Sequence, residues 1–79
     1  MASPEKLLAA TLPVISILEE EGFTEQANAL RSAVTEGDAE TVASMCHPKW
    51  LGDLNVQRFS TWADWLAELA ALQAKARRA

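Results

Sequence analysis

The sequence predicts an all-α protein: a small four-helix bundle whose third helix is short and whose last helix follows an irregular, tryptophan-containing loop. Three observations predict this fold. Apolar residues recur at every third or fourth position near the carboxyl end. Helix-start and helix-stop residues divide the rest of the chain into short segments. The 79 residues include only three Gly and three Pro, too few turn-forming residues for a fold of many short strands.

The first helix is predicted over residues 4–21, with Ser3 as its N-cap and a proline at its first position. Gly22 is expected to stop the helix in a left-handed conformation. Pro13 removes one backbone hydrogen bond inside the helix, so we expect a kink or a break just before it. Two short helices meeting at Leu12 are the alternative.

Two more helices are predicted over residues 25–36 and 39–46, capped by Thr24 and Asp38. Gly37 separates them as a helix stop. The second of the two must end early, because a proline follows closely and disfavours the helical conformation of the residue before it. Their apolar stripes are Phe23, Ala27, Leu30 and Val34 for the first helix, and Val42, Met45 and Cys46 for the second.

Residues 49–59, KWLGDLNVQRF, form a long connection between helices. Connections of this length are uncommon in compact domains and are often functional. The segment is rich in large apolar residues, so we expect it to fold back over an open end of the core, with one short helical turn. These apolar residues are Trp50, Leu51, Leu54, Val56 and Phe59.

Residues 60–75, STWADWLAELAALQAK, form the clearest amphipathic helix, and the other segments are expected to pack against it. On a helical wheel the apolar side chains fall within an arc of roughly 120°. Trp62 and Leu69 lie near its middle, which predicts that both are in the core. Trp65 and Leu72 lie at one edge.

The start of this last helix carries a capping signal. Thr61 is the expected N-cap, and Asp64 stands at the reciprocal position of a capping box, with Ser60 as an alternative cap. Basic residues in the last turn suit the helix dipole.

The charge and composition of the chain limit the classes of function that it can have. The formal net charge is -4, which disfavours nucleic-acid binding. Residues 1–40 hold two basic and eight acidic residues, a charge of -6, and residues 41–79 hold five and three, a charge of +2. No apolar run approaches the roughly 20 residues that a membrane span needs. A single cysteine favours a reducing, cytoplasmic setting. We expect one domain, residues 1–79.

Cys46 and His47 are adjacent but do not predict a catalytic pair, since neighbouring side chains usually point apart. We expect a buried, inert thiol at Cys46, and an imidazole at His47 that bonds a carbonyl of the last helical turn. One Cys and one His cannot supply a metal site within one chain. No glycine-rich phosphate loop is present. The sequence therefore predicts neither an enzyme nor a cofactor.

Three consecutive carboxylates, Glu19, Glu20 and Glu21, end the first helix and oppose its dipole without evident compensation. They indicate either a solvated helix end or an acidic patch for a basic partner. The first functional hypothesis is therefore a protein-interaction module, such as an adaptor, an inhibitor or an immunity-type protein. Trp50 and Trp65, with Leu72, would anchor a protein partner or a homodimer.

The second hypothesis is a small-ligand binder with a pocket between loop 49–59 and the last helix. Trp50, Phe59 and Trp65 would line this pocket, and Asp53 or Arg58 would supply its polar contact.

Overall fold

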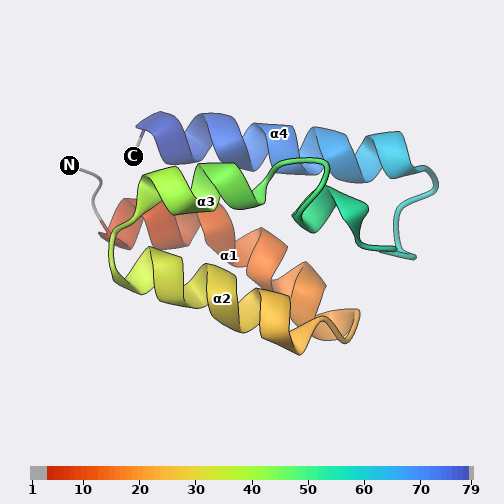
Figure 1. Ribbon diagram of the computed structural model, residues 1–79, viewed down its shortest axis with the longest axis horizontal. Coiled ribbons are helices and arrows are strands. Elements are labelled where there is room, and N and C mark those ends of the chain that lie inside the picture. Colours follow the sequence, from red (N-terminus) through yellow and green to blue (C-terminus); the bar gives the residue numbers. More distant parts are fainter. Residues whose placement is uncertain (1–3, 79) are drawn as a thin grey trace.

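Four α-helices and one short 3₁₀ helix make up the structure, a computed structural model that describes residues 4–78 (Figure 1). The helices are α1 (Pro4–Glu20), α2 (Thr24–Thr35), α3 (Ala39–Met45) and α4 (Trp62–Arg78), and the 3₁₀ helix is η1 (Leu51–Asp53). No strand occurs within residues 4–78. The predicted all-α fold, with a short third helix and an irregular segment before the last one, is confirmed.

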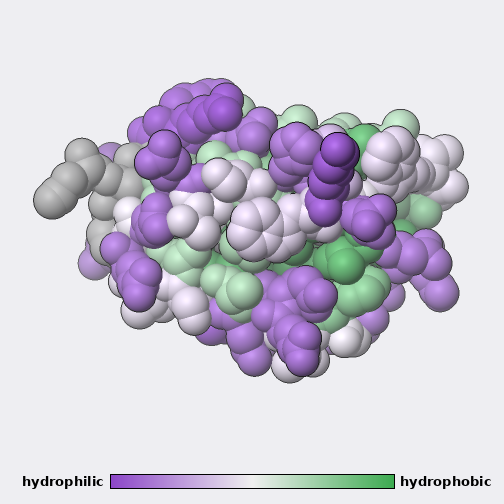
Figure 2. Space-filling model, viewed as in Figure 1, coloured by the Kyte–Doolittle hydropathy of each residue, from purple (hydrophilic) through white to green (hydrophobic). Residues whose placement is uncertain are grey.

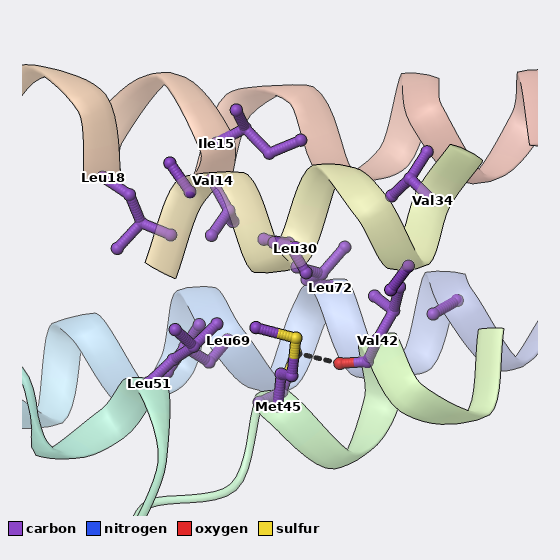
Figure 3. Packing of buried hydrophobic residues seen from close by; sticks show 14 of the residues in the cluster. Val14, Ile15, Leu18, Leu30, Val34, Val42, Met45, Leu51, Leu69 and Leu72 are labelled. Carbon is purple, nitrogen blue, oxygen red and sulfur yellow. Dashed lines mark hydrogen bonds between the residues drawn. The ribbon is translucent and has the colours of Figure 1, made fainter. Parts of the chain in front are cut away.

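The helices pack in a ring: α1 against α2, α2 against α3, α3 against α4, and α4 back against α1. The connections between α1, α2 and α3 are only a few residues long, which makes successive helices antiparallel neighbours. Figure 3 shows side chains from α1 and α2 pointing toward those from α3, α4 and η1. The buried apolar cluster comprises Leu7, Val14, Ile15, Leu18, Ala27, Leu30, Ala33, Val34, Val42, Met45, Cys46, Leu51, Val56, Trp65, Leu69, Leu72 and Ala76.

Helix α1 is continuous through Pro13, so the expected break and the alternative of two short helices are wrong. Proline removes the amide that would bond the Ala9 carbonyl. Pro13 and Ala9 are both exposed, so solvent is available to that carbonyl. The N-cap predicted at Ser3 lies outside the described residues.

Both glycine stops are confirmed. Gly22 has φ +87° and Gly37 has φ +69°, values that a residue with a Cβ rarely adopts. After α1, the Phe23 amide donates to the Leu18 carbonyl (2.8 Å) and the Gly22 amide donates to the Glu19 carbonyl (3.2 Å). This pairing is a Schellman motif, and the same pattern follows α2.

Of the three predicted helix caps that lie within residues 4–78, two are confirmed. The Asp38 carboxylate accepts hydrogen bonds from the Thr41 amide (3.1 Å) and the Thr41 hydroxyl (2.6 Å). The Thr61 hydroxyl accepts from the Asp64 amide (3.2 Å). Thr24 is not a cap: it is the first residue of α2, and Phe23 precedes it without a side-chain cap bond.

The predicted core position of Trp62 is wrong, and Trp65 is the buried tryptophan of α4. Trp62, expected in the core, is 59% exposed, and Trp65, expected at the edge, is 1% exposed. Leu72, also expected at the edge, is buried. The buried face of α4 is centred between Leu69 and Leu72. Trp65 lies on this face, and η1 and Phe59 cover its ring. Trp62 lies in the first turn, at the margin of that face.

The two indoles should differ in their contribution to stability. Trp65→Phe removes the N–H that donates to the buried Leu51 carbonyl (2.8 Å) and leaves a void, so we expect a loss of about 2–4 kcal/mol. Trp62→Phe should cost less, about 1 kcal/mol, because that ring is largely in solvent and mainly the hydrogen bond to the Gly52 carbonyl is lost. Urea unfolding followed by circular dichroism measures both, and equal losses would contradict this assignment of core and surface.

The cap of α3 should make stability depend on pH. Hydrogen bonds from Thr41 lower the pKa of the Asp38 carboxyl below its ordinary value of 3.8. A lowered folded-state pKa gives stability that is fully present above the unfolded-state pKa and is lost as pH falls through the folded-state pKa.

We therefore expect Asp38→Ala to destabilise the protein at pH 7. The difference from the wild-type protein should shrink as pH falls below 3.8. Unfolding free energies measured between pH 7 and pH 2 check this, with Asp53→Ala as the control for loss of an exposed carboxylate. A difference that did not change over this range would exclude the charged cap.

Candidate binding groove

The carboxylates that end α1 are paired within the molecule, contrary to the expectation that nothing compensates them. Glu19 accepts from Arg31 of α2 (3.2 Å). Arg58, in the loop before α4, donates its guanidinium N–H to Glu20 and its backbone amide to Glu21 (2.9 Å). The hydrogen bond to Glu20 raises the pKa of the Arg58 guanidinium. The acidic run is therefore partly neutralised by two arginines.

The residues of the predicted ligand pocket are divided between different places. Three of the five, Asp53, Phe59 and Trp65, border a hollow of about 360 Å³ between the loop and the start of α4, next to Trp62. Trp50 does not line this hollow, and Arg58 instead contacts the end of α1. Sequence reasoning could not separate them, because all five lie within sixteen positions of the chain.

The larger hollow is an open groove of about 860 Å³ between α3 and α4. We call it the α3–α4 groove. Its volume falls in the range of about 300–1,000 Å³ that is typical of ligand sites. The residues that line it are Ala39, Glu40, Ala43, Ser44, His47, Lys49, Trp50, Gln73, Ala76 and Arg77.

Small residues form the base of the groove. Ala39 and Ala43 stand one turn apart on α3, and Ala76 is buried on α4. The side-chain amide of Gln73 donates to the Ala43 carbonyl (2.9 Å) and so joins the two helices. Because alanine side chains are short, the space above them stays open along the helices.

Trp50 borders this groove and is 49% exposed. Its backbone is held in place: the His47 carbonyl accepts from the Trp50 amide (2.9 Å) and from the Gly52 amide (3.3 Å). The indoles of Trp62 and Trp65 donate to the carbonyls of Gly52 and Leu51. The indole of Trp50 donates to no atom of residues 4–78, so its N–H is available to a ligand.

Positive charge lies at both ends of the α3–α4 groove. Lys49 stands beside Trp50, and Arg77 lies near the carboxyl end of α4. Neither forms an ion pair with any residue between 4 and 78. Glu40 is the single acidic residue of the lining. Figure 2 shows hydrophilic residues gathered over the carboxyl end of α4 on this side of the molecule.

Cys46 is buried, as expected, and its thiol donates to the Val42 carbonyl (3.3 Å). Burial raises the pKa of this thiol to about 11, so it is protonated at neutral pH. His47 does not bond a carbonyl of the last turn as expected. Its Nδ1 atom accepts from the Lys49 amide (3.1 Å). Within residues 4–78 no three His, Cys, Asp or Glu side chains gather as metal ligands.

Comparison with protein-family models, with curated proteins and with solved structures gives no match to this chain. None of the helices described here is both long and apolar enough to cross a membrane.

Sequence reasoning identified Trp50 but missed the groove beside it. A signal was present in the alanines at positions 39 and 43, which leave one face of α3 small. That face could be assigned to a groove only once α3 and the carboxyl-terminal half of α4 were known to be neighbours.

Gly52 fixes the segment that carries Trp50 against α4. A Cβ at this position would stand 2.7 Å from Cδ2 of Leu66 and 3.3 Å from the His47 carbonyl oxygen. We expect Gly52→Ala to cost about 1–3 kcal/mol of unfolding free energy, because the Leu66 side chain must move aside and the His47 carbonyl must shift. Asn55→Ala, an exposed change in the same loop, is the control and should cost about 0.5 kcal/mol or less. Thermal and urea unfolding measure both, and equal costs would show that the close approach is unimportant.

Proposed function

We propose that this protein is a small helical interaction module that acts by binding a partner, not by catalysis, and that the α3–α4 groove is its docking site. The observation that carries the proposal is Trp50: a half-exposed indole with a free N–H, carried beside an open groove on a backbone that hydrogen bonds hold in place. The protonated thiol of Cys46 supports the non-catalytic part of the proposal.

An exposed tryptophan on an ordered backbone suits recognition for two physical reasons. Its large apolar surface contributes strongly when a partner covers it, and tryptophan is enriched at binding hot spots. A backbone that is already ordered also loses little conformational entropy when the partner binds. The bonds that His47 makes to the Lys49, Trp50 and Gly52 amides provide that order.

The set of anchors differs from the one expected from the sequence. Trp65 and Leu72 are enclosed in the core and have no surface to offer a protein partner or a second copy. Glu19, Glu20 and Glu21 are engaged with arginines of the same chain, which weakens the case for an acidic surface that steers a basic partner. Trp50 remains as the anchor.

We also propose a cytoplasmic location. The single cysteine of the chain is a buried, free thiol in the core. This arrangement is compatible with a reducing compartment.

Site-specific photo-cross-linking tests the docking site. A photoreactive residue at position 44, on the exposed side of α3 and lining the groove, should give a discrete adduct in extracts of cells that make the protein. Trp50→Ala should reduce that adduct about tenfold or more. The same reagent at position 29, exposed on α2, is the control and should not give it.

An adduct of twice the chain mass would identify a second copy as the partner. Equal adducts from positions 44 and 29, or an adduct at position 44 that Trp50→Ala leaves unchanged, would contradict docking in the groove.

The volume of the groove favours one second candidate, a small-ligand binder. Under this alternative the ligand would contact Trp50 and perturb its fluorescence. A metabolite panel that changes the emission of the wild-type protein, but not that of Trp50→Phe, would support it.

A further inference from the structure

We propose that the partner segment recognised by the α3–α4 groove is an acidic amphipathic helix. This inference rests on the proposed function and specifies the chemistry of the partner. It joins three properties of the groove: its base of small residues, its tryptophan anchor and its unpaired cations.

The base of the groove suits a helix. Packed helix axes lie about 8–10 Å apart, and small residues beneath a docking helix allow the closer distances. Ala39, Ala43 and Ala76 supply such a surface. α3 has seven residues, which at a rise of about 1.5 Å per residue corresponds to roughly two turns of an added helix. The bound helix would place apolar residues one turn apart along this surface and against the Trp50 ring.

The charged residues at the groove favour a partner segment of negative charge. Lys49 and Arg77 lack ion pairs within residues 4–78 and outnumber Glu40, the one acidic residue of the groove lining. Acidic side chains on the partner would complement both cations, while a basic helix would place like charges against them. The charge of the whole chain, -4, points the other way. The charges close to the groove determine which partner charge is favoured, because salt screens exposed charges that are more than about 10 Å apart.

A nucleic acid fits these observations less well. Two cations beside an apolar base provide few phosphate contacts, whereas nucleic-acid binding depends on many. The alanine floor and the single indole match apolar side chains on a helix better than a phosphate backbone.

A random peptide library displayed on phage and selected on the full-length protein tests the inference. We expect the enriched peptides to carry Leu, Ile or Phe at helical spacing together with several Asp or Glu. Circular dichroism should show helix formation on binding. Binding of a synthetic copy of an enriched peptide should weaken as salt rises from 0.05 M to 0.5 M.

Matched variants locate the site. Trp50→Ala should weaken the dissociation constant of the enriched peptide about 30-fold, whereas Trp62→Ala, the other exposed indole, should change it less than about twofold. Arg77→Glu should weaken it about 5- to 10-fold at low salt. Lys75→Glu, a charge reversal on the same helix outside the groove, is the control and should have little effect. Each variant is first shown by circular dichroism to keep the wild-type fold.

The outcomes separate the two proposals. Enriched basic or uncharged peptides that still require Trp50 would overturn the acidic helix but leave the interaction module intact. The absence of any peptide that depends on Trp50 would overturn both. Displacement of a bound acidic peptide by single-stranded DNA at equal charge would assign the groove to nucleic acid and overturn the acidic helix.

Discussion

The structure depends on the buried seam of α4, formed by Trp65, Leu69, Leu72 and Ala76. These residues recur at intervals of four, three and four, so they form one line along the helix. α1 and α3 pack along this helix, and η1 covers its amino-terminal part. In a domain of this size the apolar core is small, so one such seam carries a large share of the burial that stabilises the fold.

The seam also determines how the irregular segment is held. The indole of Trp65 donates to the Leu51 carbonyl, and the centroids of the Trp65 and Phe59 rings are 5.5 Å apart. The segment that follows α3 is therefore attached to α4 by hydrogen bonds and by apolar contacts. Trp50 directly precedes the buried Leu51, so its ring is directed outward where Leu51 is directed inward. The same contacts that complete the core thus place the candidate anchor beside the α3–α4 groove.

The packing of the loop before α4 also determines where charged side chains lie on the surface. The loop that covers Trp65 also brings Arg58 to the end of α1, where it bonds to Glu20 and Glu21. Exposed ion pairs of this kind contribute little to stability, and their main consequence is a change of surface potential. The acidic end of α1 is partly neutralised, while Lys49 and Arg77 keep their charge at the groove. A chain with net negative charge therefore has a small surplus of positive charge along the α3–α4 groove, where Lys49 and Arg77 outnumber Glu40.

The sequence by itself determined the features that depend on neighbours along the chain. These are the helical periodicity, the glycine stops at Gly22 and Gly37, and the caps at Asp38 and Thr61, all of which form within a few residues. Only the tertiary structure decided which tryptophan of α4 is buried, since the apolar arc was wide enough to admit either. It also decided the pairing of Arg58 with Glu20, 38 positions away, and the groove itself. Such features depend on which surfaces of distant segments meet, and a pattern along one segment does not contain that information.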